Sequence, residues 1–181
     1  MNQHDLSLIR DAIRGGTEAF TILVRNYKDF VYRTVYAVLQ NHADTEDVVQ
    51  ETFIKAYQSI KGLREERTFP SWIARIAVRT AFDWKKRGDR TRAAPIELEQ
   101  IAAEHDPNKA ARIRIDVENA LRQMSSEHRV TLVLREFHGF DYEEIAEILN
   151  IPIGTVRSRL FSARSKLRKA LEEERGDKNE L

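Results

Sequence analysis

The chain has 181 residues, 41% hydrophobic and 33% charged, which fits one domain or two small ones with a thin core beneath much solvated helix surface. It contains no cysteine, which excludes disulfides, thiol catalysis and thiolate metal sites. The formal net charge is only +1, yet basic residues gather in 157–169 and acids in 44–51 and 97–106, so a local surface for a polyanion is predicted.

Apolar residues recur at three- and four-residue spacing almost throughout the chain, which predicts an all-α fold. The first helix is expected from about Asp5 to Gly15 and Gly16, a pair that suits a C-terminal cap. Thr17 opens the second helix, whose apolar stripe continues to Leu39. No stretch has the ~20 apolar residues of a membrane span or the apolar centre of a signal peptide, so a soluble intracellular protein is expected.

Asp44 is predicted to be the N-cap of a third helix that reaches about Ile60. A polar, basic connection follows at 61–71, and Pro70 lies in the first turn of a fourth helix that ends near Gly88. Further along, Ser125 or Ser126 is expected to cap a helix whose apolar side comprises Val130, Val133, Leu134 and Phe137. The predicted organisation is a helical domain at 1–88, a flexible linker at 89–107, a second helical domain at 108–175 and a polar tail at 176–181.

Two helices meet around a turn in the segment FDYEEIAEILNIPIGTVRSRLFSARSKLRKAL, residues 140–171. Asn150 is expected at that turn because it tolerates a left-handed backbone better than most residues. The layout is that of a helix-turn-helix. The residues of its second helix that are predicted to face the core are Val156, Leu160, Ala163, Leu167 and Leu171.

The opposite face of this second helix is basic, as in a recognition helix whose first turns enter the major groove. Arginine can bind guanine edges with two hydrogen bonds, and an aromatic ring can contact a thymine methyl, whereas further cations suit phosphates. The residues predicted to face bases are Thr155, Arg157, Ser158 and Phe161, and Ser162 is predicted at the edge of this DNA-binding face. The residues predicted to face phosphates are Arg164, Lys166 and Arg168. The alternative interpretation is a solvated cationic face.

The stretches DTEDVVQETFIKAYQSI and RTFPSWIARIAVRTAFDWKKR resemble region 2 of the bacterial RNA polymerase sigma factors, and the pattern I-P-x-G-T-V-x-S-R resembles their region 4. With both motifs in this order and a short connection between them, the chain is similar to the extracytoplasmic-function (ECF) subfamily. The resemblance implies a protein without enzymatic activity, metal or cofactor. Such a protein binds core RNA polymerase, directs it to promoter DNA and helps to melt that DNA, its region 4 reading the minus-35 element.

The resemblance also implies residue roles. Asp47, Gln50 and Glu51 share one helix face and correspond to the contact with the polymerase clamp helices. The connection 61–71 corresponds to the loop that captures a flipped base of the minus-10 element. The residues implied in minus-10 contacts are Lys61, Arg64, Arg67, Phe69, Ser71, Trp72, Arg79, Lys85, Lys86 and Arg87. Among these, Trp72 is expected in the core ahead of base stacking, and Arg79 stands where many members carry Asn.

Members of this subfamily usually pair with an anti-sigma factor, often membrane-bound, so the resemblance implies such a partner, a cytoplasmic location and a monomeric free state. Two alternatives remain. The first is a stand-alone helix-turn-helix repressor or activator, which would need a dimer face, and 117–124 is the candidate. The second is a metal-dependent phosphoesterase built from His42, Asp44, Glu46, Asp47 and Glu51.

Overall fold

The structure, a computed structural model, describes residues 3–91, 117 and 119–176. Most of the predicted linker, the start of the second domain and the tail after 176 lie outside these residues. Within them the regular elements are helical, and the predicted all-α class is confirmed. The elements are α1 (Gln3–Ile13), α2 (Thr17–Leu39), α3 (His42–Ser59), the 3-10 turns η1 (Ile60–Gly62) and η2 (Glu66–Thr68), α4 (Phe69–Thr91), α6 (Ser126–Glu136), α7 (Tyr142–Leu149) and α8 (Ile153–Gly176).

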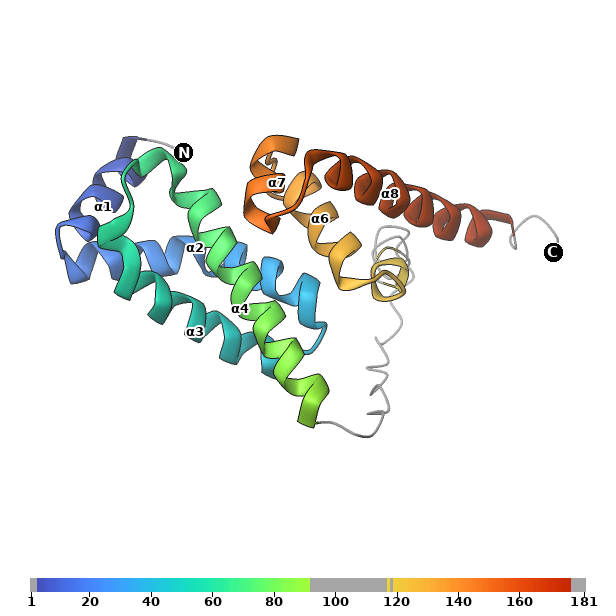
Figure 1. Cartoon of the computed structure of the whole chain (residues 1–181), viewed down its shortest axis with the longest axis horizontal. Coiled ribbons are helices and arrows are strands. Elements are labelled where there is room, and N and C mark those ends of the chain that lie inside the picture. The colour runs from blue at the N-terminus through green and yellow to red at the C-terminus, as the bar shows by residue number, and fades with distance from the viewer. Residues whose placement is uncertain (1–2, 92–116, 118, 177–181) are drawn as a thin grey trace.

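The N-terminal domain consists of α1 to α4, which lie together at one end of the molecule (Figure 1). Helices α2, α3 and α4 pack against one another, and α1 packs on α2. Ile9, Leu23, Val31, Val48 and Ile73 are among its fully buried side chains. Each such burial contributes roughly 1.5–3 kcal/mol of stabilisation relative to exposure, so the apolar stripes, rather than helix propensity, hold these helices together.

The turn between α1 and α2 confirms the predicted glycine cap. Gly15 has a φ of +99° and its N–H donates to the Ala12 carbonyl at 3.0 Å. A Cβ on Gly16 would lie 2.9 Å from the Asp11 carbonyl oxygen. The first glycine therefore supplies a left-handed backbone, and the second permits a close approach of two chain segments.

The start of α3 corrects one prediction. Asn41, not Asp44, is the N-cap, because the Asn41 side chain accepts the Asp44 N–H at 2.9 Å and the helix begins at His42. Asp44 lies within the first turn, where its carboxylate complements the helix dipole. Helix α4 also continues past Gly88 to Thr91, since a single glycine costs a helix only about 1 kcal/mol.

The C-terminal domain comprises α6, α7 and α8. The Ser125 side chain accepts the His128 N–H and caps α6, as predicted, but Phe137 follows the last residue of α6 and is 58% exposed instead of buried. Asp141 and Glu144 form a capping box at the start of α7. Asn150 has φ 53° and ψ 52°, so the predicted left-handed turn of the helix-turn-helix is confirmed.

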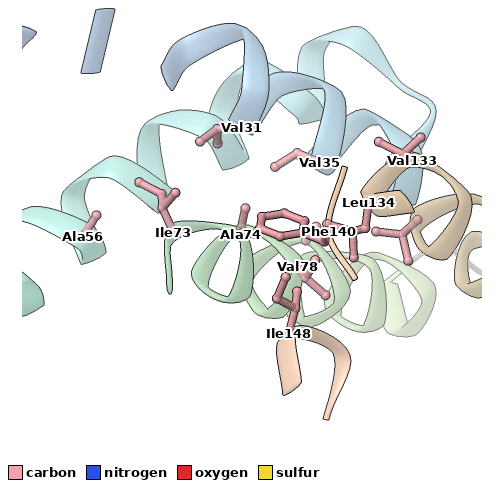
Figure 2. Close-up of a cluster of buried hydrophobic side chains, with 14 of the residues drawn as sticks. Val31, Val35, Ala56, Ile73, Ala74, Val78, Val133, Leu134, Phe140 and Ile148 are labelled. Carbon is pink, nitrogen blue, oxygen red and sulfur yellow. The ribbon is translucent and has the colours of Figure 1, made fainter. Parts of the chain in front are cut away.

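The two domains pack directly against each other, which the sequence did not indicate. Helix α6 lies on α2, and α7 lies on α4. Figure 2 shows Val35, Ala74 and Val78 from the first domain beside Leu134, Phe140 and Ile148 from the second. These side chains are buried, so one hydrophobic cluster continues from one domain into the other.

Candidate nucleic-acid interface

Helix α8 presents its predicted DNA face to solvent. It begins directly after Pro152, and the buried side chains Val156, Leu160 and Ala163 hold its inner side against the domain. On the outer side Arg157 is exposed, and Phe161 is 78% exposed. The exposed ring lies in a group with Arg157, Arg164 and Arg168, so apolar and cationic surface occur together on this face.

A shallow hollow of about 350 Å³ surrounds this phenylalanine. Its walls combine apolar surface with three guanidinium groups, so it can accommodate an apolar group next to an anion. Thr155 and Ser162 are half-buried, and the Ser158 hydroxyl donates to the Thr155 carbonyl at 3.0 Å. The residues that line the hollow are Tyr142, Arg157, Leu160, Phe161, Arg164, Ser165 and Arg168.

Arg164, predicted to contact a phosphate, lines the same hollow and also has a partner within the chain. Its Nε and Nη2 donate to Glu136 Oε1 at 3.0 and 2.6 Å. This hydrogen-bonded carboxylate is the main cause that raises the pKa of Arg164. The guanidinium therefore joins α8 to the end of α6. Arg164, Lys166 and Arg168 are all exposed.

The predicted minus-10 loop contains both exposed cations and a buried aromatic residue. Lys61, Arg64 and Arg67 are exposed across η1 and η2. Phe69, however, is 1% exposed, and its ring contacts Tyr27 at a centroid distance of 5.0 Å. We therefore correct its assignment from a DNA contact to a core residue, because α4 begins at this position and turns the ring inward.

Trp72 and Ser71 occupy the first turns of α4. Trp72 is half-buried, with its ring centroid 5.6 Å from that of Phe69, in line with the expectation that packing outweighs base stacking. The Ser71 hydroxyl donates to the Thr68 carbonyl at 3.0 Å. These two side chains thus support the loop that carries the exposed cations.

Farther along α4, four cations differ in their exposure and in their partners. Arg79 and Lys86 are exposed. Arg87 lies over the Trp84 ring at 5.5 Å and 3.5 Å from Glu51 Oε2. Lys85 Nζ donates to Ser126 Oγ of α6 at 2.9 Å, so this predicted DNA residue contacts the other domain.

Helix α3 carries the predicted polymerase contact. Asp47 and Gln50 are exposed, and Glu51 is half-buried. Lys55 Nζ lies 2.8 Å from Glu51 Oε1, and this hydrogen bond is the main cause that lowers the pKa of Glu51. Ile54, which the sequence reasoning missed, is 58% exposed. Ile54 follows Asp47 by seven positions and Gln50 by four, which places all three on one helix face. This spacing could have predicted Ile54 as part of the same surface.

Two residues proposed for the phosphoesterase alternative, His42 and Glu51, have other partners. The His42 ring stacks on Tyr36 at a centroid distance of 4.8 Å, and His42 Nδ1 hydrogen-bonds the Tyr32 hydroxyl at 2.7 Å. Among residues 3–91, 117 and 119–176, no group of three His, Asp or Glu side chains could hold a metal ion.

In the same part of the chain, no helix is both long and apolar enough to cross a membrane.

Comparison with known proteins identifies both halves of the chain. Residues 23–91 match the family model of Sigma-70 region 2, and residues 114–167 match that of Sigma-70 region 4. The chain is 33% identical over 183 residues to the RNA polymerase sigma-H factor of Pseudomonas aeruginosa, covering 94% of this chain and 95% of the relative. It is also 33% identical over 176 residues to the ECF RNA polymerase sigma factor SigW of Bacillus subtilis, covering 90% and 94% of the two chains.

Solved structures support the fold. The chain resembles CnrH, solved in complex with the cytosolic domain of CnrY, with a TM-score of 0.68, 24% identity and coverage of 93% and 97%. It resembles RpoE of Bartonella quintana, solved with the anti-sigma factor NepR, with a TM-score of 0.71, 24% identity and coverage of 86% and 98%. Because full-length relatives are more than 30% identical and both regions occur in order, the chain belongs to the extracytoplasmic-function (ECF) subfamily of RNA polymerase sigma factors.

Proposed function

We propose that this ECF sigma factor binds core RNA polymerase through the exposed face of α3, reads the minus-35 element with α8 and opens the minus-10 element with the loop 61–71 and α4. The observation that carries the proposal is the open face of α8, where Phe161 is 78% exposed beside Arg157. The protein acts by binding and holding DNA, with the polymerase as the catalyst.

The minus-35 contact rests on α8. Arg157, Ser158 and Phe161 are exposed within its first turns, the part of a recognition helix that reaches base edges. Lys166 and Arg168 are exposed further along and suit phosphates, which set affinity and register without reading sequence. Arg164 serves mainly to orient α8, since its guanidinium is held by Glu136.

The polymerase contact rests on α3. Asp47, Gln50 and Ile54 form one exposed strip along this helix, and it combines charge, an amide and an apolar side chain. Glu51 is paired with Lys55, so it shapes this strip from its edge. Tethering two weak DNA-binding surfaces to one polymerase makes the second contact effectively intramolecular.

The minus-10 contact rests on exposed cations beside a short loop. Lys61, Arg64 and Arg67 can hold the phosphates of a displaced strand, while a flipped base is bound in the loop at a cost of a few kcal/mol for unstacking. Arg79, Lys86 and Arg87 continue this basic surface along α4.

We also propose that the protein works in the cytoplasm and that an anti-sigma factor regulates it, as NepR is paired with the Bartonella quintana relative. The free chain is proposed to be a monomer. In the segment considered for a dimer face, the apolar side chains Ala120 and Met124 are buried within this chain, which supports the monomer.

The test is transcription by core RNA polymerase on fragmented DNA from the source organism, with and without the protein. New discrete transcripts are expected. Reversing Arg157 to Glu removes a base contact worth about 1–3 kcal/mol, so it lowers transcript yield about tenfold or more. Replacing Gln50 and Ile54 together by Ala weakens polymerase binding and lowers all transcripts alike.

Matched controls are Arg122→Glu and Gln123→Ala, because both side chains are exposed outside the proposed surfaces. These variants are expected to transcribe at the level of the unchanged protein. Absence of transcripts, together with tight binding of the chain alone to duplex DNA, would replace the sigma-factor mechanism by that of a repressor or activator.

A further inference from the structure

The connection between α3 and α4 has an inner and an outer side that alternate with a period of three residues. Its buried side chains, which belong to the core, are Ile60, Leu63 and Phe69. Its exposed cations follow the same spacing and are Lys61, Arg64 and Arg67. A 3-10 helix has three residues per turn, so side chains at i and i+3 lie above one another. The turns η1 and η2 therefore leave the three cations on the outer side.

Glu66 is the polar member of the inner row, since it lies three residues after Leu63 and three before Phe69. Its side chain is 29% exposed, and its Oε1 accepts a hydrogen bond from Arg10 Nε of α1 at 2.9 Å. This hydrogen bond is the main cause that lowers the pKa of Glu66, and the charge of Arg14 adds to the effect. A carboxylate of the loop is thus paired with a cation 56 residues earlier in the chain.

Helix α1 lies beside this connection, as Figure 1 shows, and it packs on both η1 and η2. Three of its side chains are buried in the core, so α1 is fixed independently of the ion pair; they are Leu8, Ile9 and Ala12. Within the connection, the Thr68 N–H and hydroxyl both donate to the Glu65 carbonyl, at 3.1 and 2.8 Å. These local bonds shape η2, whereas the Arg10–Glu66 pair joins η2 to a helix whose position the core already determines.

The same pair affects the charge of the loop. Glu66 is the direct neighbour of Arg67, and a carboxylate without a counter-charge at this position would repel phosphates or attract one of the loop cations. Arg10 supplies that counter-charge from outside the loop. The row of exposed cations is therefore held in place and also keeps its positive charge for a DNA strand.

Building on the function proposed above, we propose that Arg10 of α1 is a positioning residue for capture of the minus-10 base: through Glu66 it fixes η2, so that the loop cations are ordered before the strand arrives. A loop that is ordered in advance loses less conformational entropy on binding. Helix α1 thereby contributes to promoter opening from the inner side of the loop.

The test combines a protein change with a DNA change, because a merely structural effect of Arg10 would not depend on the captured base. The DNA is a forked fragment with an unpaired minus-10 strand, taken from a promoter that the transcription experiment identifies. One abasic site at a time removes a base of this strand and leaves its phosphates. Fluorescence anisotropy measures binding of the fragment to core polymerase that carries the protein.

With the unchanged protein, one abasic position is expected to weaken binding by about tenfold, the size of a lost base contact. Arg10→Ala should weaken binding of the intact fragment by about fivefold, the effect that an exposed ion pair of good geometry can have. Because most of the capture is then already lost, the same abasic site should cost Arg10→Ala only about twofold more.

A charge swap supplies the second test. Arg10→Glu places two acids side by side and should weaken binding more than Arg10→Ala. The combination of Arg10→Glu with Glu66→Arg should restore affinity to within about twofold of the unchanged protein and bring back the abasic penalty. Arg25→Ala, which removes an exposed cation of α2, is the matched control and should keep both. Urea denaturation should give similar midpoints for Arg10→Ala and Arg25→Ala, since an exposed pair contributes little to stability.

An Arg10→Ala protein that keeps the full abasic penalty would overturn the role of Arg10, even if its overall affinity falls. A swapped variant that binds as weakly as Arg10→Glu would overturn it as well. If the unchanged protein directs transcription but shows no penalty at any minus-10 position, base capture by the loop fails first, and the role of Arg10 fails with it.

Discussion

Arg164 on α8 donates through both Nε and Nη2 to one carboxylate oxygen of Glu136 on α6, at 3.0 and 2.6 Å. The pair is nearly half exposed on both sides, so it stabilises the fold by no more than about 1 kcal/mol. Its main effect is to hold a cation of the DNA face against its own domain, which has a measurable consequence for binding.

Replacing Glu136 by Ala should release the Arg164 guanidinium for a phosphate. We expect tighter binding of the chain to a fluorescent duplex of arbitrary sequence, and a slope of log K against log salt that steepens by about 1. Glu143→Ala, which removes an exposed acid of α7, controls for the general loss of negative charge. Equal slopes for the two variants would show that Arg164 makes no new contact.

Two phenylalanines should separate stability from binding. Phe69→Ala removes a core ring that is 1% exposed and should lower the free energy of unfolding by about 3–5 kcal/mol. Phe161→Ala removes a ring that is 78% exposed and should change that free energy by less than about 0.5 kcal/mol.

Urea titration monitored by circular dichroism measures both values. At temperatures where both variants are folded, transcript yield with core polymerase should fall more for Phe161→Ala than for Phe69→Ala. A stable Phe69→Ala protein that fails only in promoter melting would return Phe69 to the DNA surface.

The cap of α3 gives a third prediction. Asn41→Ala removes the acceptor for the Asp44 N–H and should cost about 1 kcal/mol, whereas Asn41→Ser keeps a capping oxygen and should cost far less. Denaturation midpoints of the two variants test this. If Asp44 were the cap, both changes would be nearly neutral.

The buried ring of His138 should lower the free energy of unfolding in mild acid. Burial, and secondarily the charge of Arg33, lower the pKa of His138 from 6.5 to about 4. Between these two values the unfolded chain binds a proton that the folded chain excludes, so the free energy of unfolding falls as the pH falls from about 6.5 towards 4. Above pH 6.5 both states are neutral at this ring, and the effect is absent.

The measurement is the melting temperature between pH 7 and pH 4.5 for the unchanged protein and for His138→Gln. The glutamine keeps a donor for Thr34 and does not titrate. We expect the melting temperature of His138→Gln to fall less between pH 7 and pH 4.5 than that of the unchanged protein. The carboxylates titrate alike in both proteins, so the difference reports His138. Identical losses would mean that His138 is protonated without cost in the folded state.

Local patterns were enough to predict most of the helices and the recognition helix. The left-handed turn at Asn150, the glycine cap at Gly15 and the inward face of α8 each depend on residues within one or two turns. The open position of Phe161 follows from the same local spacing. At the start of α3, both Asn41 and Asp44 are residue types that cap helices. The local pattern favoured Asp44, whereas Asn41 is the N-cap.

The sequence by itself determined an all-α chain with two helical domains, because helix periodicity, caps and turn residues act over a few positions. Only the tertiary structure decided which charged groups remain available. Arg164 finds its partner 28 residues away and Arg129 finds the Ala37 carbonyl 92 residues away, while Phe69 turns into a core completed by α2. Such pairings depend on how whole helices pack, and no spacing along the chain encodes them.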